Sequence, residues 1–168
     1  RGPRLGLERL YLGVAAAMFV ARLATVLVSW QASGIEYRAD IAALQSLPAG
    51  ARLAVANPPN AADVVPTPLV HLPVLAAALR QAFVPTLFAI PGQQPIALAP
   101  PYAALARATS PDALWERFVA GDAKLRGAAL AGYDYIVFTG LRPFALVDRR
   151  GLVPLYLAPR FQLYRVAD

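Results

Sequence analysis

The sequence predicts an α/β protein: an N-terminal transmembrane helix, then a small domain with a mixed sheet of about four to six strands flanked by helices. Three observations favour this class. Residues 10–30 (LYLGVAAAMFVARLATVLVSW) form an apolar run broken only by Arg22, long enough as a helix to cross the hydrocarbon core of a bilayer. Beyond the run, short β-compatible segments alternate with helical patterns, and the sixteen prolines lie mostly between these segments.

The composition narrows the function classes. Only 15% of the 168 residues are charged and the mean hydropathy is +0.47, which suits a chain with a membrane segment. The net charge is +6, but no basic stripe is interleaved with aromatics, so nucleic-acid binding is not expected. The absence of cysteine excludes disulfides, thiolate metal sites and cysteine nucleophiles.

The apolar run has two alternatives to a membrane span: a secretory signal peptide, whose basic end would be Arg1, Arg4 and Arg9, and the buried helix of a soluble protein. The length of the run, the arginine inside it and the poor cleavage site at Ala32-Ser33-Gly34 favour the span.

Flanking charge predicts how the span is oriented. Three arginines and one glutamate precede the run, whereas Glu36, Arg38 and Asp40 nearly balance after it. The positive-inside rule then gives two parts. Residues 1–34 are a span with a cytoplasmic flank in the bacterial inner membrane, and residues 35–168 are a periplasmic domain.

Small residues recur at every fourth position of the run, at Gly13, Ala17 and Ala21. Such a row lets helix backbones approach closely in lipid, so the expected partners are the bilayer and other transmembrane helices. The sequence begins with Arg1 rather than Met, so we expect a fragment or a processed product.

Polar residues form a second row in the run. Arg22, Thr25 and Ser29 share a helical face by their spacing. Arg22 either faces the interior of a helix bundle or reaches an interface, and the sequence leaves both open.

The first elements of the domain are predicted from the spacing of apolar residues and from the Pro- and Gly-containing segments that end them. Tyr37, Ile41 and Leu44 predict an amphipathic helix over residues 36–47, ended by Pro48-Ala49-Gly50. The segment RLAVA, residues 52–56, predicts a first strand.

A loop is expected from residue 57 to 68, and then a helix over Leu72–Phe83 with Pro73 in its first turn, where proline is tolerated. Strands are expected over Thr86–Ile90 and Ile96–Leu98, joined by a Pro-Gly turn.

The second half of the domain begins with helices. The pattern predicts one from Pro100 to Arg107 and another from Ser110 to about Val119, because Ser110 is a good N-cap, Pro111 fits the first position and Asp112 favours the positive end of the helix dipole. A further helix is expected over residues 122–131.

The chain ends in strands. Residues 133–139 (YDYIVFT) give the strongest strand pattern, ended by Gly140 and Pro143. Residues 152–157 and 161–166 predict a hairpin around Ala158-Pro159-Arg160.

No established catalytic motif is present, and one histidine cannot build a two-histidine metal site, so no catalytic residue, metal or cofactor is expected. The weak binding candidates are Asn57, His71, Gln93 and Gln94. Asn57 would join Asn60 and Asp63 in a polar patch after the first strand, where α/β sheets bind ligands, although ordinary turn chemistry explains them more simply.

Two charged segments are also expected to have structural rather than catalytic roles. Asp134, at the mouth of its strand, is expected to make a bonded turn or cap contact rather than catalyse a reaction. Asp148-Arg149-Arg150 is expected to be a solvated turn.

Four segments resemble a known family. They are YRADIAALQSLPAGARLAVA, AFVPTLFAIPGQQPIAL, YDYIVFTG and FQLYRV. Together they are similar to the C-terminal extramembrane domain of bacterial polytopic proteins of the dolichyl-phosphate-mannose and aminoarabinose transferase superfamily. The resemblance implies a noncatalytic periplasmic domain of a glycosyltransferase-like protein, near a lipid-linked sugar or a glycan acceptor. The family's catalytic aspartate lies in an early loop with no counterpart here.

Two other functions stay open. The chain could be a single-span periplasmic interaction or scaffold domain without enzymatic activity, or a small hydrolase that uses His71.

Overall fold

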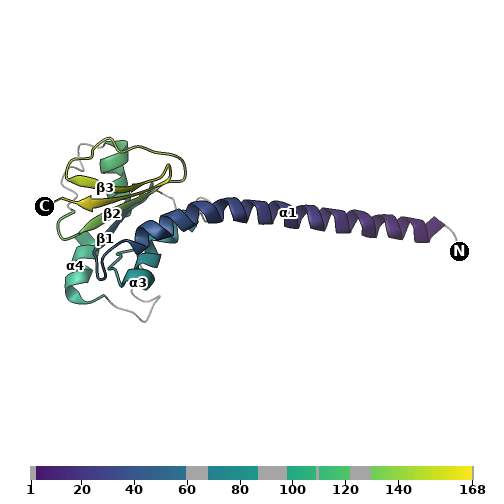
Figure 1. Ribbon diagram of the computed structural model, residues 1–168, viewed down its shortest axis with the longest axis horizontal. Coiled ribbons are helices and arrows are strands. Elements are labelled where there is room, and N and C mark those ends of the chain that lie inside the picture. The colour runs from purple at the N-terminus through teal and green to yellow at the C-terminus, as the bar shows by residue number, and fades with distance from the viewer. Residues whose placement is uncertain (1–2, 60–67, 87–97, 109, 122–129, 168) are drawn as a thin grey trace. The chain divides into compact units, whose positions relative to one another are not determined.

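The computed structural model describes residues 3–59, 68–86, 98–108, 110–121 and 130–167, and Figure 1 shows their helices and strands. The chain divides into two compact units, Arg1–Ala39 and Asp40–Asp168. The first unit is helical and the second is a mixed α/β domain, which confirms the predicted fold class.

Helix α1 runs without interruption over Pro3–Gln45. Within the described residues, its segment Leu10–Gln45 is the one helix long and apolar enough to cross a membrane, with a mean hydropathy of 2.0 in its most apolar window. The helix predicted over residues 36–47 is therefore confirmed up to Gln45, but it continues the apolar helix rather than forming an element of its own. Gly34 costs a helix only about 1 kcal/mol relative to alanine, and no proline separates the apolar run from the amphipathic pattern that follows.

The sheet has four strands among the described residues: β1 (Leu53–Ala56), β2 (Tyr135–Thr139), β3 (Leu152–Leu157) and β4 (Phe161–Val166). Their order is β1-β2-β4-β3. β1 and β2 are parallel, whereas β2–β4 and β3–β4 are antiparallel, so the sheet is mixed as predicted. The predicted terminal hairpin is confirmed at both strands.

The two inner strands, β2 and β4, are mostly buried on both faces of the sheet. All four residues of β1 are buried, which matches its short, continuous apolar sequence and its parallel pairing. β3 is an edge strand whose pairing with β4 shifts register between Pro154 and Tyr156, and most of its side chains are exposed.

The helical stretch predicted over Leu72–Phe83 begins earlier and ends sooner than expected. It consists of α2 (Pro68–His71), the 3-10 turn η1 (Leu72–Val74) and α3 (Leu75–Arg80). Proline has no N–H to donate to the carbonyl four residues earlier, which fits the tighter turn around Pro73.

Phe83 leaves the helix because its backbone joins the sheet. Its N–H donates to the carbonyl of Ala51 at 2.8 Å, and its carbonyl accepts from the N–H of Leu53 at 2.9 Å. Gln81 makes the turn between the two elements with a left-handed backbone, at φ 54°. The expected extension of the helix to Phe83 was therefore wrong.

The next helices confirm their predicted positions: α4 (Pro100–Ala108), α5 (Pro111–Trp115) and the π-helical turn η2 (Glu116–Ala120). The side chain of Ser110 accepts a hydrogen bond from the N–H of Ala113 at 3.1 Å, as an N-cap should.

Three predicted elements extend outside the described residues. They are the strands over 86–90 and 96–98 and the helix over 122–131. Of their described ends, Thr86 lies in a turn, and Leu98 and Leu130 have no regular secondary structure.

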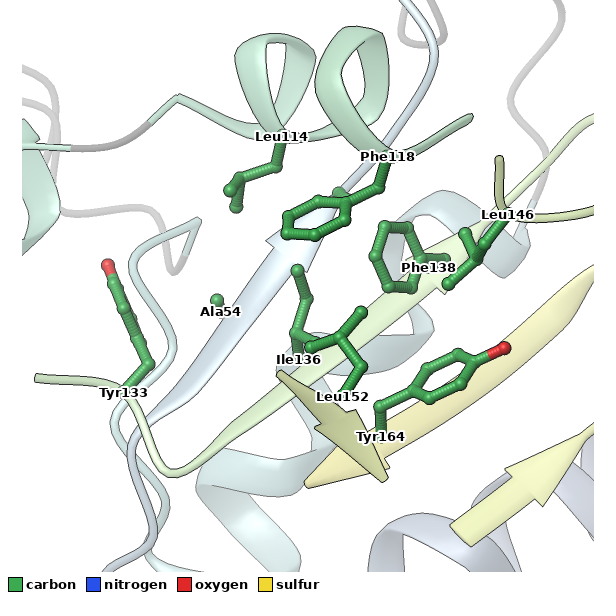
Figure 2. Close-up of a cluster of buried hydrophobic side chains, with 10 residues drawn as sticks. Ala54, Leu114, Phe118, Tyr133, Ile136, Phe138, Leu146, Leu152 and Tyr164 are labelled. Atoms are coloured by element: carbon green, nitrogen blue, oxygen red, sulfur yellow. The ribbon is translucent and has the colours of Figure 1, made fainter. Parts of the chain in front are cut away.

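Aromatic side chains fill the core between α5, η2 and one face of the sheet. The ring of Phe138 packs edge-on against Phe118 (centroids 5.7 Å apart) and against Tyr164 (5.8 Å). In Figure 2, Leu114 and Phe118 point from their helical turns toward the strands. The buried cluster consists of Ala54, Ala56, Leu114, Phe118, Tyr133, Ile136, Phe138, Leu146, Leu152 and Tyr164.

Candidate functional site

Two polar side chains meet at the carboxyl ends of the parallel strands. Asn57 directly follows β1 and Thr139 is the last residue of β2, so the parallel pairing brings them to the same edge of the sheet. The Thr139 hydroxyl donates to Oδ1 of Asn57 at 2.6 Å. Thr139 is fully buried and Asn57 is 8% exposed. This edge is where α/β sheets commonly bind ligands, but here the hydroxyl of Thr139 and the amide oxygen of Asn57 bind each other.

The backbone around this pair is tightly packed. The N–H of Asn57 donates to the carbonyl of Pro111, at the start of α5, at 3.4 Å. Gly140 follows Thr139, and a Cβ there would lie 2.6 Å from a ring carbon of Phe144 and 2.8 Å from the carbonyl oxygen of Arg142. A side chain at Gly140 would displace the chain, so this corner is filled by protein.

A second buried polar contact lies on β4. The Tyr164 hydroxyl donates to Oε1 of Gln162 at 2.8 Å, and Nε2 of Gln162 donates to the carbonyl of Phe144 at 3.2 Å. Burial raises the pKa of Tyr164. The sequence analysis did not single out Gln162. Its strand position, one residue from the apolar Phe161 and Leu163 and thus on the opposite face, was the available signal.

The other predicted binding residues are His71, Gln93 and Gln94, and no contact between the described one, His71, and Asn57 is observed. His71 is the exposed last residue of α2. Gln93 and Gln94 lie outside the described residues, as do Asn60 and Asp63 of the expected polar patch.

Asp134 has the bonded role that was expected. Its carboxylate accepts from the backbone N–H of Arg52 at 2.9 Å and from the guanidinium Nε at 3.1 Å, and forms an ion pair with Nη2 at 2.5 Å. These hydrogen bonds and the positive charge hold the pKa of Asp134 below its ordinary value and raise the pKa of Arg52. Asp134 therefore links the beginnings of the two parallel strands.

Asp148 shapes the loop before β3. Its carboxylate accepts a hydrogen bond from the backbone N–H of Arg150 at 3.0 Å and forms an ion pair with the guanidinium of Arg150 at 2.9 Å. This contact lowers the pKa of Asp148. Within the same loop, the N–H groups of Val147 and Asp148 both donate to the carbonyl of Phe118, at 2.8 and 3.3 Å, and so cap the end of η2.

Asp40 was counted among the charges that follow the apolar run, and in the structure its side chain is fully buried. A buried carboxylate is costly unless it is paired. Asp40 is therefore not a solvated flanking charge, unlike the exposed Arg38.

Over the described ranges, no three His, Cys, Asp or Glu side chains come together as they would in a metal site. The carboxylates of Asp134 and Asp148 both pair with arginines, and the hydroxyl of Thr139 is bonded to the amide oxygen of Asn57. The described side chains are thus arranged to hold strands and loops together. No protein-family model, curated protein or solved structure matches this chain.

Proposed function

We propose that the chain is the extramembrane domain, with its last membrane span, of a bacterial glycosyltransferase-like membrane protein that acts on lipid-linked sugars. In this proposal α1 crosses the inner membrane, the domain lies in the periplasm, and the domain itself is noncatalytic. The observation that carries the membrane part is α1: the side chains of its apolar segment are exposed, among them Phe19 (63%), Leu27 (62%) and Trp30 (73%). A row of large exposed apolar side chains of this length suits lipid rather than water.

The noncatalytic part is supported by the partners of the polar groups. Asp134 is held by Arg52, and Asn57 by Thr139. A catalytic carboxylate needs a raised pKa to act as a general acid or a position where it can reach substrate, whereas ion pairing lowers the pKa of Asp134. The glycosyltransferase part is supported by the sequence resemblance.

The test measures sugar transfer from a polyprenyl-phosphate-linked donor in membranes of cells with and without the gene for this chain. We expect one such transfer reaction to be lost in the deletion strain and the purified chain to catalyse none. Complementation with a gene that lacks the codons for residues 46–168 should restore transfer poorly, because the domain supports the reaction.

Unchanged transfer of every lipid-linked sugar after deletion would contradict the glycosyltransferase assignment. That result would favour the scaffold alternative, in which α1 serves as an anchor and the domain binds another periplasmic protein.

A further inference from the structure

Arg22 is the one charged residue in the apolar run of residues 10–30. Its region of α1 is exposed, and over the described part of the chain no hydrogen bond or ion pair of its guanidinium is observed; the Thr25 hydroxyl donates to its backbone carbonyl at 2.8 Å. In a membrane, a guanidinium with no counter-group is costly. Once α1 is in lipid, the guanidinium of Arg22 therefore needs a partner.

The position of Arg22 makes either membrane surface hard to reach. Counting from the sequence, it lies about 18 Å along the helix from Leu10 and about 12 Å from Trp30, at about 1.5 Å per residue. The Cα–Cβ bonds of a helix tilt toward its N-terminus, so the side chain leans toward the farther edge of the run. An arginine side chain is shorter than that distance, which leaves the guanidinium within the apolar layer.

The helix face around Arg22 is suited to a protein neighbour. Ser29 lies two turns further along the same face, and Thr25 lies beside it. The small-residue row of Gly13, Ala17 and Ala21 lies on a different face, since at about 100° per residue these positions stand about 180°, 140° and 100° away from Arg22 around the helix. Arg22 therefore marks a contact face of its own.

We propose that the Arg22 face of α1 docks against another transmembrane helix that carries a carboxylate at the same depth. This inference rests on the proposed membrane span. A carboxylate neutralises the charge of the guanidinium and accepts two parallel hydrogen bonds from it. This is the strongest pairing available to Arg22 in a low-dielectric layer.

A second copy of this chain does not meet that requirement. Two parallel copies related by a two-fold axis through this face would bring the two Arg22 side chains together, and like charges repel strongly in lipid. The partner must be a helix of different sequence.

The absence of cysteine makes the proposal testable by site-specific labelling. The full chain carries a donor dye on Leu10→Cys, an exposed position, and is reconstituted in phosphatidylcholine vesicles. The probe is a synthetic leucine-alanine transmembrane helix with an acceptor dye and a single glutamate at its centre. Matched probes carry glutamine or leucine at that position, and energy transfer measures association.

We expect the glutamate helix to associate about tenfold more tightly than the glutamine and leucine helices, because only it supplies a charged partner. Arg22→Leu should abolish this preference and Arg22→Lys should retain part of it. Arg38→Leu, which removes an exposed arginine beyond the run, should leave the preference intact.

Equal association of the three probes with the wild-type chain would overturn the proposal and assign Arg22 to lipid phosphates. Self-association of the wild-type chain that Arg22→Leu abolishes would overturn it in favour of a second copy. Alkaline carbonate extraction of the same vesicles tests the membrane span separately from the docking of the Arg22 face. Release of the chain would refute the span and the inference together, whereas an integrated chain without a glutamate preference would refute the inference alone.

Discussion

The carboxylate of Asp134 accepts hydrogen bonds from both the backbone N–H and the guanidinium of Arg52, which lies 82 residues earlier in the chain. The backbone completes the link, since the N–H groups of Asp134 and Tyr135 donate to the carbonyl of Arg52 at 2.9 and 3.1 Å. The contact therefore fixes where the two parallel strands begin relative to each other.

Replacing Asp134 with Asn should lower the free energy of unfolding by about 1 kcal/mol or less at pH 7, because the pair is partly exposed (44% and 37%) and solvent screens it. Chemical denaturation of the full chain in nanodiscs measures this. Asp148→Asn is the matched control. Its pair joins residues two apart and should contribute less, so an equal or larger loss there would contradict the role of Asp134.

The Asp134 contact also predicts a pH dependence. Its pKa is lower in the folded chain than the ordinary value of 3.8. Its contribution is therefore fully present above about pH 4 and is lost as the pH falls through the lowered folded value. The difference in stability between wild type and Asp134→Asn should shrink below pH 4. A difference that stays constant from pH 7 to pH 3 would contradict an ionic contribution.

The buried pair Asn57–Thr139 should be strongly coupled. Asn57→Ala leaves a buried hydroxyl without its acceptor and should cost about 1–3 kcal/mol of unfolding free energy. Thr139→Val removes the donor instead. The double variant should cost less than the sum of the two, because the first change already breaks the contact. Additive losses in denaturation experiments would show that the hydrogen bond does not matter for stability.

The left-handed Gln81 offers a stabilising change. A non-glycine residue in that conformation costs roughly 1 kcal/mol, and Gln81 is exposed. Gln81→Gly should therefore raise the free energy of unfolding by up to about 1 kcal/mol, whereas Gln81→Ala should change it little. Destabilisation by glycine would mean that the Gln81 side chain makes a contact worth more than the backbone strain.

The aromatic core should be the most sensitive region of the domain. Phe138 is fully buried between Phe118 and Tyr164, so Phe138→Ala should cost about 3–5 kcal/mol. Val147→Ala, at a site 72% exposed, is the control and should stay within about 0.5 kcal/mol of wild type. A small effect at Phe138, measured by near-ultraviolet circular dichroism during thermal unfolding, would contradict the packing in Figure 2.

Local signals predicted much of the fold. Ser110-Pro111-Asp112 predicted the start of α5 because capping depends on neighbours in sequence, and the hairpin of β3 and β4 was found for the same reason. The end of α3 was missed because Phe83 is drawn into the sheet by Ala51 and Leu53, which the helical pattern of residues 72–83 does not reveal.

The site was less predictable. Asn57 was singled out, but its partner Thr139 lies 82 residues away and is found only through the pairing of β1 with β2. The burial of Asp40 was missed for a related reason: a charged residue near a membrane run is ordinarily a solvated flank, and only the packing of the second unit buries it.

The central proposal is that α1 crosses the membrane with the α/β domain on the outer side. The direct measurement is labelling of intact cells with a membrane-impermeant maleimide, using single-cysteine variants of this cysteine-free chain. Val147→Cys, which is 72% exposed in the domain, should be labelled in intact cells, and Leu7→Cys, before the apolar run, only after lysis. Labelling of Leu7→Cys but not Val147→Cys in intact cells, or of neither until lysis, would contradict the claim.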